Sequence, residues 1–162
     1  MTLRVGSGFD AHRLEAGRPL LLGGIVVPSD RGLAGHSDGD CLIHALCDAL
    51  LGAAAAGDMG VHFPSSDDRW KGAASHVFLE RVGELLRRGS LRIVNVDATV
   101  IAETPRLGPH LAAMRESLAA MLDLDLGRVS VKAKSTDALG ALGRGEGIAA
   151  MATVLLEEIP EC

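Results

Sequence analysis

Apolar residues recur at helical spacing in several stretches of the chain. From Asp40 onward they return every three or four residues through Leu50, which predicts a helix with one buried face. Residues 77–86 repeat this pattern, and Pro105 is suited to the first turn of a further helix that we expect to continue through Met121. The pattern therefore predicts roughly three helices.

Short apolar runs bounded by glycine and polar residues predict strands. Four such runs cover residues 3–9, 91–101, 129–134 and 148–155. Apolar triplets on either side of Gly23-Gly24 predict a hairpin. Polar stretches predict loops at residues 35–39, 57–68 and 140–147. Because no linker or repeat divides these elements, we expect one α/β (α+β) domain over residues 1–162.

Composition excludes several classes of function. The chain has 162 residues with a net charge of −5 and only 2% aromatic residues, and Lys and Arg are not concentrated in any segment, so we expect no nucleic-acid partner. No apolar window is long enough to span a bilayer, and no signal peptide is visible, so we expect no membrane association. Three cysteines do not form a disulfide framework, which favours a cytoplasmic location.

The first candidate site is the segment Gly6-Ser7-Gly8-Phe9-Asp10-Ala11-His12. In an extended segment, residues two apart project from the same face, so Asp10 and His12 point the same way. A carboxylate and an imidazole together suit a divalent metal ion. The alternative is an acidic loop residue beside a surface histidine.

A second polar segment, residues 35–44, leads into the first predicted helix. If His44 on that helix approaches Asp10 and His12, they form a zinc site with an open fourth position. His36 precedes the helix, whose free N–H groups can bind an anion, and Ser37 lies in a weak capping-box position. A helical histidine without a metal is the alternative for His44, and Cys41 is a rival ligand, although we favour a buried apolar role for it.

The third polar cluster combines residues 132–137 with Gly143-Arg144-Gly145-Glu146-Gly147. Hydroxyl, ammonium and carboxylate groups at a strand end suit a diphosphate with a bound metal ion. The guanidinium of Arg144 can form paired hydrogen bonds to phosphate. The alternative is a polar turn after an edge strand.

In chain order, these segments resemble the 2-C-methyl-D-erythritol 2,4-cyclodiphosphate synthase family of the non-mevalonate isoprenoid pathway. The likeness extends from Arg4 to about Leu156. The motifs that carry it are Gly8-Phe9-Asp10-Ala11-His12, Gly35-His36-Ser37-Asp38-Gly39-Asp40, His44-Ala45-Leu46, Asp58-Met59-Gly60, Phe63-Pro64, Lys71-Gly72-Ala73, Pro105-Arg106 and Gly143-Arg144-Gly145-Glu146-Gly147-Ile148. Each motif is modest alone, but the ordered set is specific.

The resemblance implies a fold, an assembly and a reaction. It implies a homotrimer in which each protomer has a mixed sheet facing the threefold axis and helices on the other face, with active sites between subunits. The implied substrate is a cytidine diphosphate, 4-diphosphocytidyl-2-C-methyl-D-erythritol 2-phosphate. The implied products are the cyclic diphosphate and CMP, so the enzyme would be a phosphorus–oxygen lyase.

The resemblance also assigns residues to these roles. Asp10, His12 and His44 would bind Zn²⁺, and Asp137 would hold Mg²⁺ or Mn²⁺. His36 and Ser135 would be catalytic and would stabilise the five-coordinate phosphorus. The implied substrate-binding residues are Ser37 for the erythritol phosphates, Asp58, Met59, Gly60, Phe63, Pro64, Ser65, Ser66 and Asp67 for the methylerythritol, Ala102, Glu103, Thr104, Pro105, Arg106, Leu107 and Gly108 for cytosine, and Lys134, Thr136, Ala141 and Arg144 around the nucleotide diphosphate.

The implied reaction needs no protein side chain as a general base. The nucleophile is the 2-phosphate of the substrate, which is mostly dianionic at neutral pH because its second pKa is about 6. This agrees with the lack of a Ser-His-Asp arrangement. Five residues depart from the usual family pattern. Ser135 and Lys134 stand for Thr, Asp137 stands for Glu, which is one methylene longer, Ala141 stands for a commonly aromatic residue, and Ser65 stands for Asp.

Two other readings of the same residues remain open. A zinc-dependent phosphohydrolase of nucleotide diphosphates would use the same ligands and yield a linear product. A non-catalytic module with a structural zinc would close the fourth position with a thiolate from Cys41 or Cys47.

Overall fold

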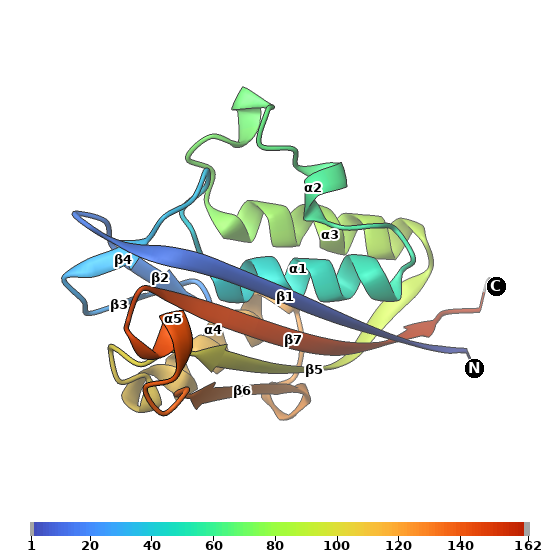
Figure 1. The fold of residues 1–162 in the computed structure, drawn as a ribbon. Coiled ribbons are helices and arrows are strands. Elements are labelled where there is room, and N and C mark those ends of the chain that lie inside the picture. The colour runs from blue at the N-terminus through green and yellow to red at the C-terminus, as the bar shows by residue number, and fades with distance from the viewer. Residues whose placement is uncertain (1, 161–162) are drawn as a thin grey trace.

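A five-stranded sheet in the order β4-β1-β7-β5-β6 forms the centre of the computed structural model, which describes residues 2–160 (Figure 1). Its strands are β1 (Leu3–Ala16), β4 (Arg31–Leu33), β5 (Leu91–Ile101), β6 (Val129–Lys134) and β7 (Gly147–Glu158). Neighbouring strands are antiparallel except β5 and β6, which are parallel. The predicted hairpin is confirmed as β2 (Leu20–Leu22) and β3 (Ile25–Val27). The expected mixed sheet is therefore confirmed.

Three longer helices pack on one face of this sheet. They are α1 (Cys41–Ala53), α3 (Ser75–Arg88) and α4 (Leu111–Leu122). Helix α1 lies against β1 and β7, α3 lies against α1, and α4 lies against β6. The chain also forms short helices α2 (Met59–His62) and α5 (Gly140–Gly143), and 3₁₀ turns at Asp68–Trp70, Gly108–His110 and Leu126–Arg128. No helix within residues 2–160 combines the length and apolar character needed to cross a membrane.

The two faces of the sheet differ in what covers them. In β7, Ala150, Ala152 and Val154 are buried beneath the helices, whereas Met151 between them is 51% exposed. In β1, Phe9 lies opposite Met151 and is 58% exposed. The described helices therefore leave the face that carries Phe9 and Met151 largely open to solvent.

Two glycines bring β1 unusually close to helix α1. A Cβ atom on Gly6 would lie 2.1 Å from the carbonyl oxygen of Ala49, and one on Gly8 would lie 2.0 Å from that of Ala45. No other residue fits such a gap, because every larger residue would push the helix away. This approach brings the residues that follow Gly8 on β1 next to the first turns of α1.

Several predicted boundaries are wrong. Strand β1 continues to Ala16 instead of ending at residue 9, and the helix expected from Pro105 begins at Leu111 after a 3₁₀ turn. Two of the expected loops contain the short helices α2 and α5, and strand β4 was not expected. These elements are three or four residues long, so they leave no periodic pattern in the sequence.

The start of α1 also differs from the prediction. Its N-cap is Asp40, whose Oδ1 accepts the backbone N–H groups of Leu42 and Ile43 at 3.1 Å, so Ser37 is not the cap. The other carboxylate contacts of Asp40 are to the N–H groups of Gly23 and Gly24 in the β2–β3 turn. The expectation that the first amides of this helix are free to bind an anion is therefore wrong, because Asp40 occupies them.

Candidate metal centre

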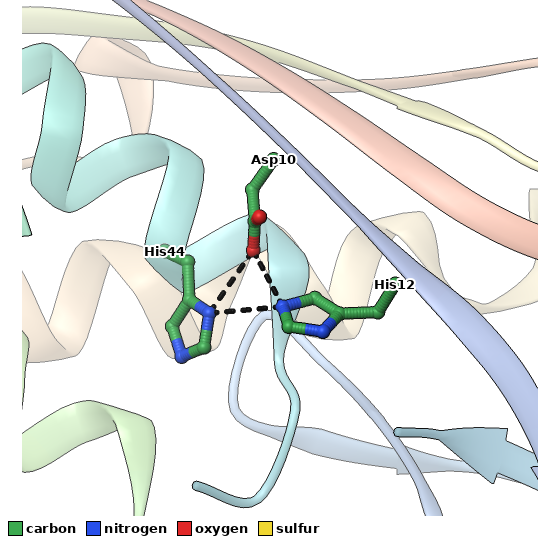
Figure 2. Close-up of side chains that lie close together, drawn as sticks. All are labelled: Asp10, His12 and His44. Carbon is green, nitrogen blue, oxygen red and sulfur yellow. Dashed lines mark hydrogen bonds and ion pairs between the residues drawn. The ribbon is translucent and has the colours of Figure 1, made fainter. Parts of the chain in front are cut away.

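Three side chains from β1 and α1 converge at one point (Figure 2). Asp10 Oδ2 lies 2.7 Å from His12 Nε2 and 3.0 Å from His44 Nδ1, and the two nitrogens are 3.2 Å apart. Asp10 and His12 project from the face of β1 that carries Gly6 and Gly8, as their alternation predicted. The convergence expected from the sequence is confirmed, and these residues form the only such group of potential metal ligands within residues 2–160.

The charges of the triad are strongly coupled. Burial by itself would raise the pKa of Asp10, but hydrogen bonds with His12 and His44 outweigh it and hold the pKa far below its usual range. The hydrogen bond to Asp10 raises the pKa of His12, against the opposing effect of burial. The pocket therefore stabilises a carboxylate with positive charge beside it, and a proton or a metal ion can supply that charge.

The donor set fits a zinc-sized cation. One carboxylate oxygen and two imidazole nitrogens make a ligand set typical of catalytic zinc sites, which keep a fourth position open. In a tetrahedral site with bonds of about 2.0 Å, ligand atoms lie roughly 3.3 Å apart. The three atoms here are 2.7–3.2 Å apart, so a slight opening of the triad accommodates such an ion.

Neither of the two cysteines within residues 2–160 belongs to this group. Cys41 and Cys47 belong to α1 and are fully buried in the apolar core. Burial raises the pKa of both thiols well above their usual value, which disfavours the thiolate form that a metal requires. The preference for Cys41 as a buried apolar residue is confirmed, and neither thiol belongs to the triad.

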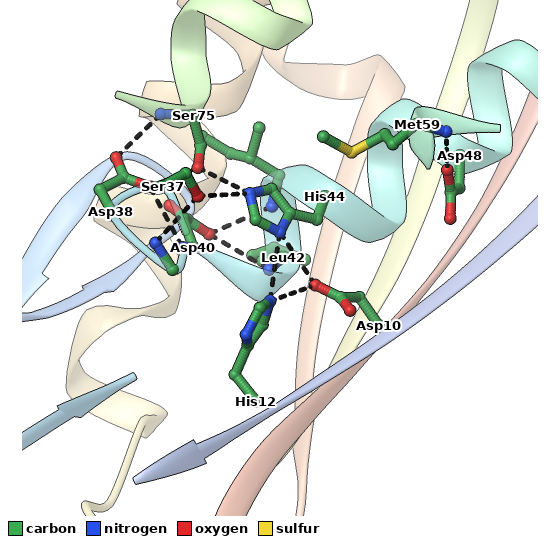
Figure 3. Close-up of polar contacts among 12 residues, drawn as sticks. Asp10, His12, Ser37, Asp38, Asp40, Leu42, His44, Asp48, Met59 and Ser75 are labelled. Atoms are coloured by element: carbon green, nitrogen blue, oxygen red, sulfur yellow. Dashed lines mark hydrogen bonds and ion pairs between the residues drawn. The ribbon is translucent and has the colours of Figure 1, made fainter. Parts of the chain in front are cut away.

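Three polar residues surround the far side of the His44 ring (Figure 3). Ser37 Oγ lies 3.1 Å and Ser75 Oγ 3.0 Å from Nε2 of His44, and Asp38 in turn accepts hydrogen bonds from Ser75. Ser37 was expected to contact phosphate, but Asp38 and Ser75 were missed. Ser75 is a fully buried polar residue at the start of a helix, and this contrast with the apolar core is the signal that marks it.

The loop expected to bind methylerythritol, through residues 58–60 and 63–67, contacts α3 through Phe63 and Phe78. Asp58 caps α2 by accepting the N–H of Val61, and Asp67 pairs with Arg69. Met59 donates its N–H to Asp48 of α1, while Ser65 and Ser66 are exposed. The loop is therefore tied to the helices at its base and open to solvent at residues 65–66.

An aromatic cluster connects this loop to the triad. Phe63 lies 4.9 Å from Phe78 and 5.1 Å from Trp70 between ring centroids, and Phe78 lies 5.9 Å from the ring of His44. Trp70 and Phe78 were not predicted to matter. Through these contacts Phe63, which precedes Pro64, joins an aromatic cluster that extends to the ring of His44.

The segments expected to hold the nucleotide meet at one end of the sheet. The N–H of Ala102 donates to the carbonyl oxygen of Lys134 at 2.9 Å, which joins the start of residues 102–108 to that of residues 134–137. Lys134, Ser135, Asp137 and the rest of this group are mostly exposed. Within it, Ala102 and Leu107 are buried, Glu103, Pro105 and Thr136 are half-buried, and Thr104, Arg106 and Gly108 are exposed.

Arg144 and Ala141 lie in the next polar turn. Both are exposed, and Arg144 pairs with Glu146 through a 2.6 Å contact. A Cβ atom on Gly145 would lie 3.7 Å from Thr104 Oγ1, so this turn adjoins the expected cytosine segment. His36 is exposed in the loop before α1, where its carbonyl oxygen accepts the N–H of Gly72.

Within one protomer, the triad and the nucleotide segments do not face each other. The pairing registers align Ala11, Ala149, Ile101 and Lys134 in one row across the sheet. Paired residues share a face, so Lys134 lies on the open face, whereas Asp10 lies one residue away from Ala11 and on the helix-covered face. Three strand spacings also separate the two groups, which is about 14 Å.

The chain matches known proteins over nearly its full length. The model of the YgbB family matches residues 3–157. A 2-C-methyl-D-erythritol 2,4-cyclodiphosphate synthase from Alkalilimnicola ehrlichii is 57% identical over 155 residues, which cover 95% of this chain and 94% of that protein. Among solved structures, the bifunctional IspDF of Campylobacter jejuni has a TM-score of 0.94 and 40% identity over 98% of this chain and 43% of that one. A Plasmodium falciparum IspF in complex with CDP has a TM-score of 0.86 and 30% identity over 98% and 97% of the two chains.

Proposed function

This chain belongs to the YgbB family, and on that premise we propose that it cyclises 4-diphosphocytidyl-2-C-methyl-D-erythritol 2-phosphate to 2-C-methyl-D-erythritol 2,4-cyclodiphosphate and releases CMP. The observation that carries this function is the convergence of Asp10, His12 and His44 at the end of the sheet where the nucleotide segments gather. The enzyme is a phosphorus–oxygen lyase of isoprenoid biosynthesis. We take residues 1–162 as one catalytic domain and propose a cytoplasmic location.

We propose Zn²⁺ as the ion held by the triad. Two imidazoles and one carboxylate suit zinc, and both buried thiols lie outside the set. When bound, the ion would polarise an oxygen of the β-phosphate and so favour attack at that phosphorus. Asp10, His12 and His44 would hold the ion, and the hydroxyls of Ser37 and Ser75 lie at the second ring nitrogen of His44.

The remaining residues bind the substrate and bring its ends together. The substrate's 2-phosphate is the nucleophile, so the chain needs to suppress repulsion between anions more than it needs a base. We assign Ser37 to the phosphates of the erythritol and residues 58–60 and 63–67 to its carbon skeleton. Backbone groups of residues 102–108 would bind cytosine.

Phosphate charge would be neutralised in the nucleotide half of the site. We assign Lys134, Thr136 and Arg144 to the diphosphate, with Ala141 beside the nucleotide. Asp137 would hold Mg²⁺ or Mn²⁺, as a hard carboxylate ligand does beside phosphate oxygens. His36 and Ser135 would donate hydrogen bonds to the five-coordinate phosphorus.

We propose that a homotrimer completes the site. The triad and Lys134 lie on opposite faces of one protomer's sheet, so a neighbouring subunit has to supply the nucleotide half. The open face carries apolar side chains that a monomer would leave in water: Val5, Phe9 and Met151 are 71%, 58% and 51% exposed. Such a patch is typical of an interface between subunits.

Phosphorus NMR of the reaction products tests this function. The zinc-loaded enzyme should convert the substrate to CMP and a cyclic diphosphate without consuming water. A linear diphosphate with a terminal phosphate resonance would instead identify a phosphohydrolase that uses the same ligands. No conversion with zinc and magnesium both present would contradict the proposal.

A further inference from the structure

His44 presents its two ring nitrogens to two different sets of atoms. Nδ1 faces Asp10 Oδ2 at 3.0 Å and His12 Nε2 at 3.2 Å. Nε2 faces the hydroxyls of Ser75 and Ser37, at 3.0 and 3.1 Å (Figure 3). A neutral imidazole carries one N–H, so an Nδ1 that binds a metal requires the proton to sit on Nε2 and to find an acceptor there.

Asp38 orients the Ser75 hydroxyl to be that acceptor. Ser75 Oγ donates a hydrogen bond to Asp38 Oδ1, and the Ser75 backbone N–H donates to Oδ2 at 2.8 Å. A carboxylate accepts and does not donate, so the hydroxyl proton of Ser75 points to Asp38. The lone pairs of Ser75 Oγ are then left to accept the N–H of His44.

The hydroxyl of Ser37, which also lies at His44 Nε2, has different contacts from that of Ser75. Its Oγ accepts the N–H of Gly39 at 3.2 Å, and no carboxylate within residues 2–160 accepts a hydrogen bond from its hydroxyl. The difference between the two hydroxyls matters because the site is buried. Ser75 is fully buried, and the His44 side chain is only 13% exposed. Water therefore cannot readily replace Ser75 as the acceptor.

We propose that Ser75, held by Asp38, is a positioning residue for metal binding. It accepts the Nε2–H of His44, keeps the Nδ1 lone pair available to the ion, and fixes the plane of the ring together with Phe78. Metal-binding histidines commonly donate their second N–H to a carboxylate, and here one hydroxyl lies between the histidine and the carboxylate. This inference deepens the metal role proposed above and rests on it.

Zinc affinity, measured by competition with a chromophoric chelator, is the first test. Ser75→Ala should weaken Zn²⁺ binding about 10- to 100-fold. Asp38→Asn should weaken it similarly, because the amide turns a donor toward Ser75 and the hydroxyl proton then opposes the His44 N–H. The matched control is Ser37→Ala, which removes the other hydroxyl at His44 Nε2 and should weaken Zn²⁺ binding less than about threefold. Ser75→Thr keeps the hydroxyl and should restore most of the affinity.

The second test observes the proton itself. In NMR spectra of the zinc-loaded protein, the Nε2–H of His44 should exchange slowly with solvent, and in Ser75→Ala it should exchange fast. If Ser75→Ala does not fold, the exchange rate in the wild type and the zinc affinity of Asp38→Asn still test the proposal. The proposal is overturned if both variants bind zinc as the wild type does, or if the wild-type proton exchanges as fast as that of exposed His76. A wild-type chain that binds no zinc would refute the metal proposal itself, which is a different result.

Discussion

The metal triad and the nucleotide segments lie at the same end of the sheet but differ in how the chain holds them. The residues of the triad lie on a long strand and a helix and are half-buried. Their metal-binding atoms contact one another, and the second ring nitrogen of His44 contacts the hydroxyls of Ser37 and Ser75. Lys134, Ser135, Asp137 and Arg144 are exposed, and among the charged groups of residues 2–160 Arg144 pairs only with Glu146. The proposed metal half of the site is built within one chain, whereas the proposed nucleotide half lies open to solvent.

In the proposed trimer, this difference would give the two halves of the site separate roles. Rigid elements fix the metal ligands before substrate arrives, which avoids an ordering cost at the moment of reaction. Exposed loops can adjust around a flexible nucleotide and close against a neighbouring subunit. Mutations in the first half should therefore abolish chemistry or folding, whereas mutations in the second half should weaken binding.

The largest effect is expected from His44→Ala. Loss of one of three ligands should remove Zn²⁺ binding, and turnover should fall at least about 10³-fold, because metal stabilisation of developing charge is worth several kcal/mol. Metal content by atomic absorption and CMP release measure the two effects. His76→Ala, on the exposed surface of α3, is the matched control and should behave as wild type. Turnover that survives without bound zinc would exclude the triad from the reaction.

Asp40→Ala should be the most damaging change to the scaffold beneath the triad. It leaves the N–H groups of Leu42, Ile43, Gly23 and Gly24 without their acceptor. The free energy of unfolding should fall by about 2–4 kcal/mol, as expected for the loss of a buried helix cap with additional hydrogen bonds. Urea denaturation measures this change. Asp137→Asn, in the exposed half, keeps a residue type that tolerates the positive φ of this position and should leave the free energy of unfolding within about 0.5 kcal/mol of wild type.

Arg144→Ala probes the open half directly. The loss of charge-assisted hydrogen bonds to phosphate should raise KM about 10- to 100-fold, while zinc affinity and stability remain at wild-type values. Steady-state kinetics and a zinc titration measure these quantities. Glu146→Gln is the companion variant, because it frees Arg144 from its present partner and should not raise KM. A loss of zinc binding in Arg144→Ala would show that the two halves are not independent.

The smallest effect concerns the pH dependence of the metal-free protein. The raised pKa of His12 adds stability that is fully present below its ordinary value of 6.5 and is lost as pH rises through the raised value. The lowered pKa of Asp10 adds stability that is present above its ordinary value of 3.8 and is lost as pH falls through the lowered value. The Tm difference between wild type and Asp10→Asn should therefore be largest between pH 3.8 and pH 6.5 and should shrink as pH rises through the raised pKa of His12. A difference that grows at alkaline pH would contradict the ion pair.

The sequence predicts the parts of the site more readily than their arrangement. The two-residue spacing of Asp10 and His12 and the helical setting of His44 could be predicted, since both depend on local periodicity. Their contact depends on Gly6 and Gly8, which permit a close approach that no local pattern encodes. The link from Asp38 to Ser75 spans 37 residues and was missed for the same reason.

A prediction from the local sequence was also wrong where a side chain of the same segment formed hydrogen bonds that had not been expected. The first amides of α1 were expected to bind an anion, but the carboxylate of Asp40 takes them. The polar cluster at residues 132–137 and 143–147 could be identified as a functional candidate from its residue types, whereas a role for residues 58–60 and 63–67 was implied only by the family resemblance. The short helices α2 and α5 could not be predicted, because a single helical turn is stabilised by its contacts and not by periodicity.

Mixing two inactive variants tests the central claim that each active site joins the triad of one subunit to the nucleotide half of another. His44→Ala and Arg144→Ala chains are unfolded together, refolded as a one-to-one mixture, loaded with zinc and assayed for CMP release at a substrate concentration that leaves each variant alone inactive. With random assembly of trimers, about a quarter of the sites should combine two intact halves, so activity should return to about a quarter of the wild-type value. A mixture that stays as inactive as its two parents would contradict a shared site and would place both halves within one chain.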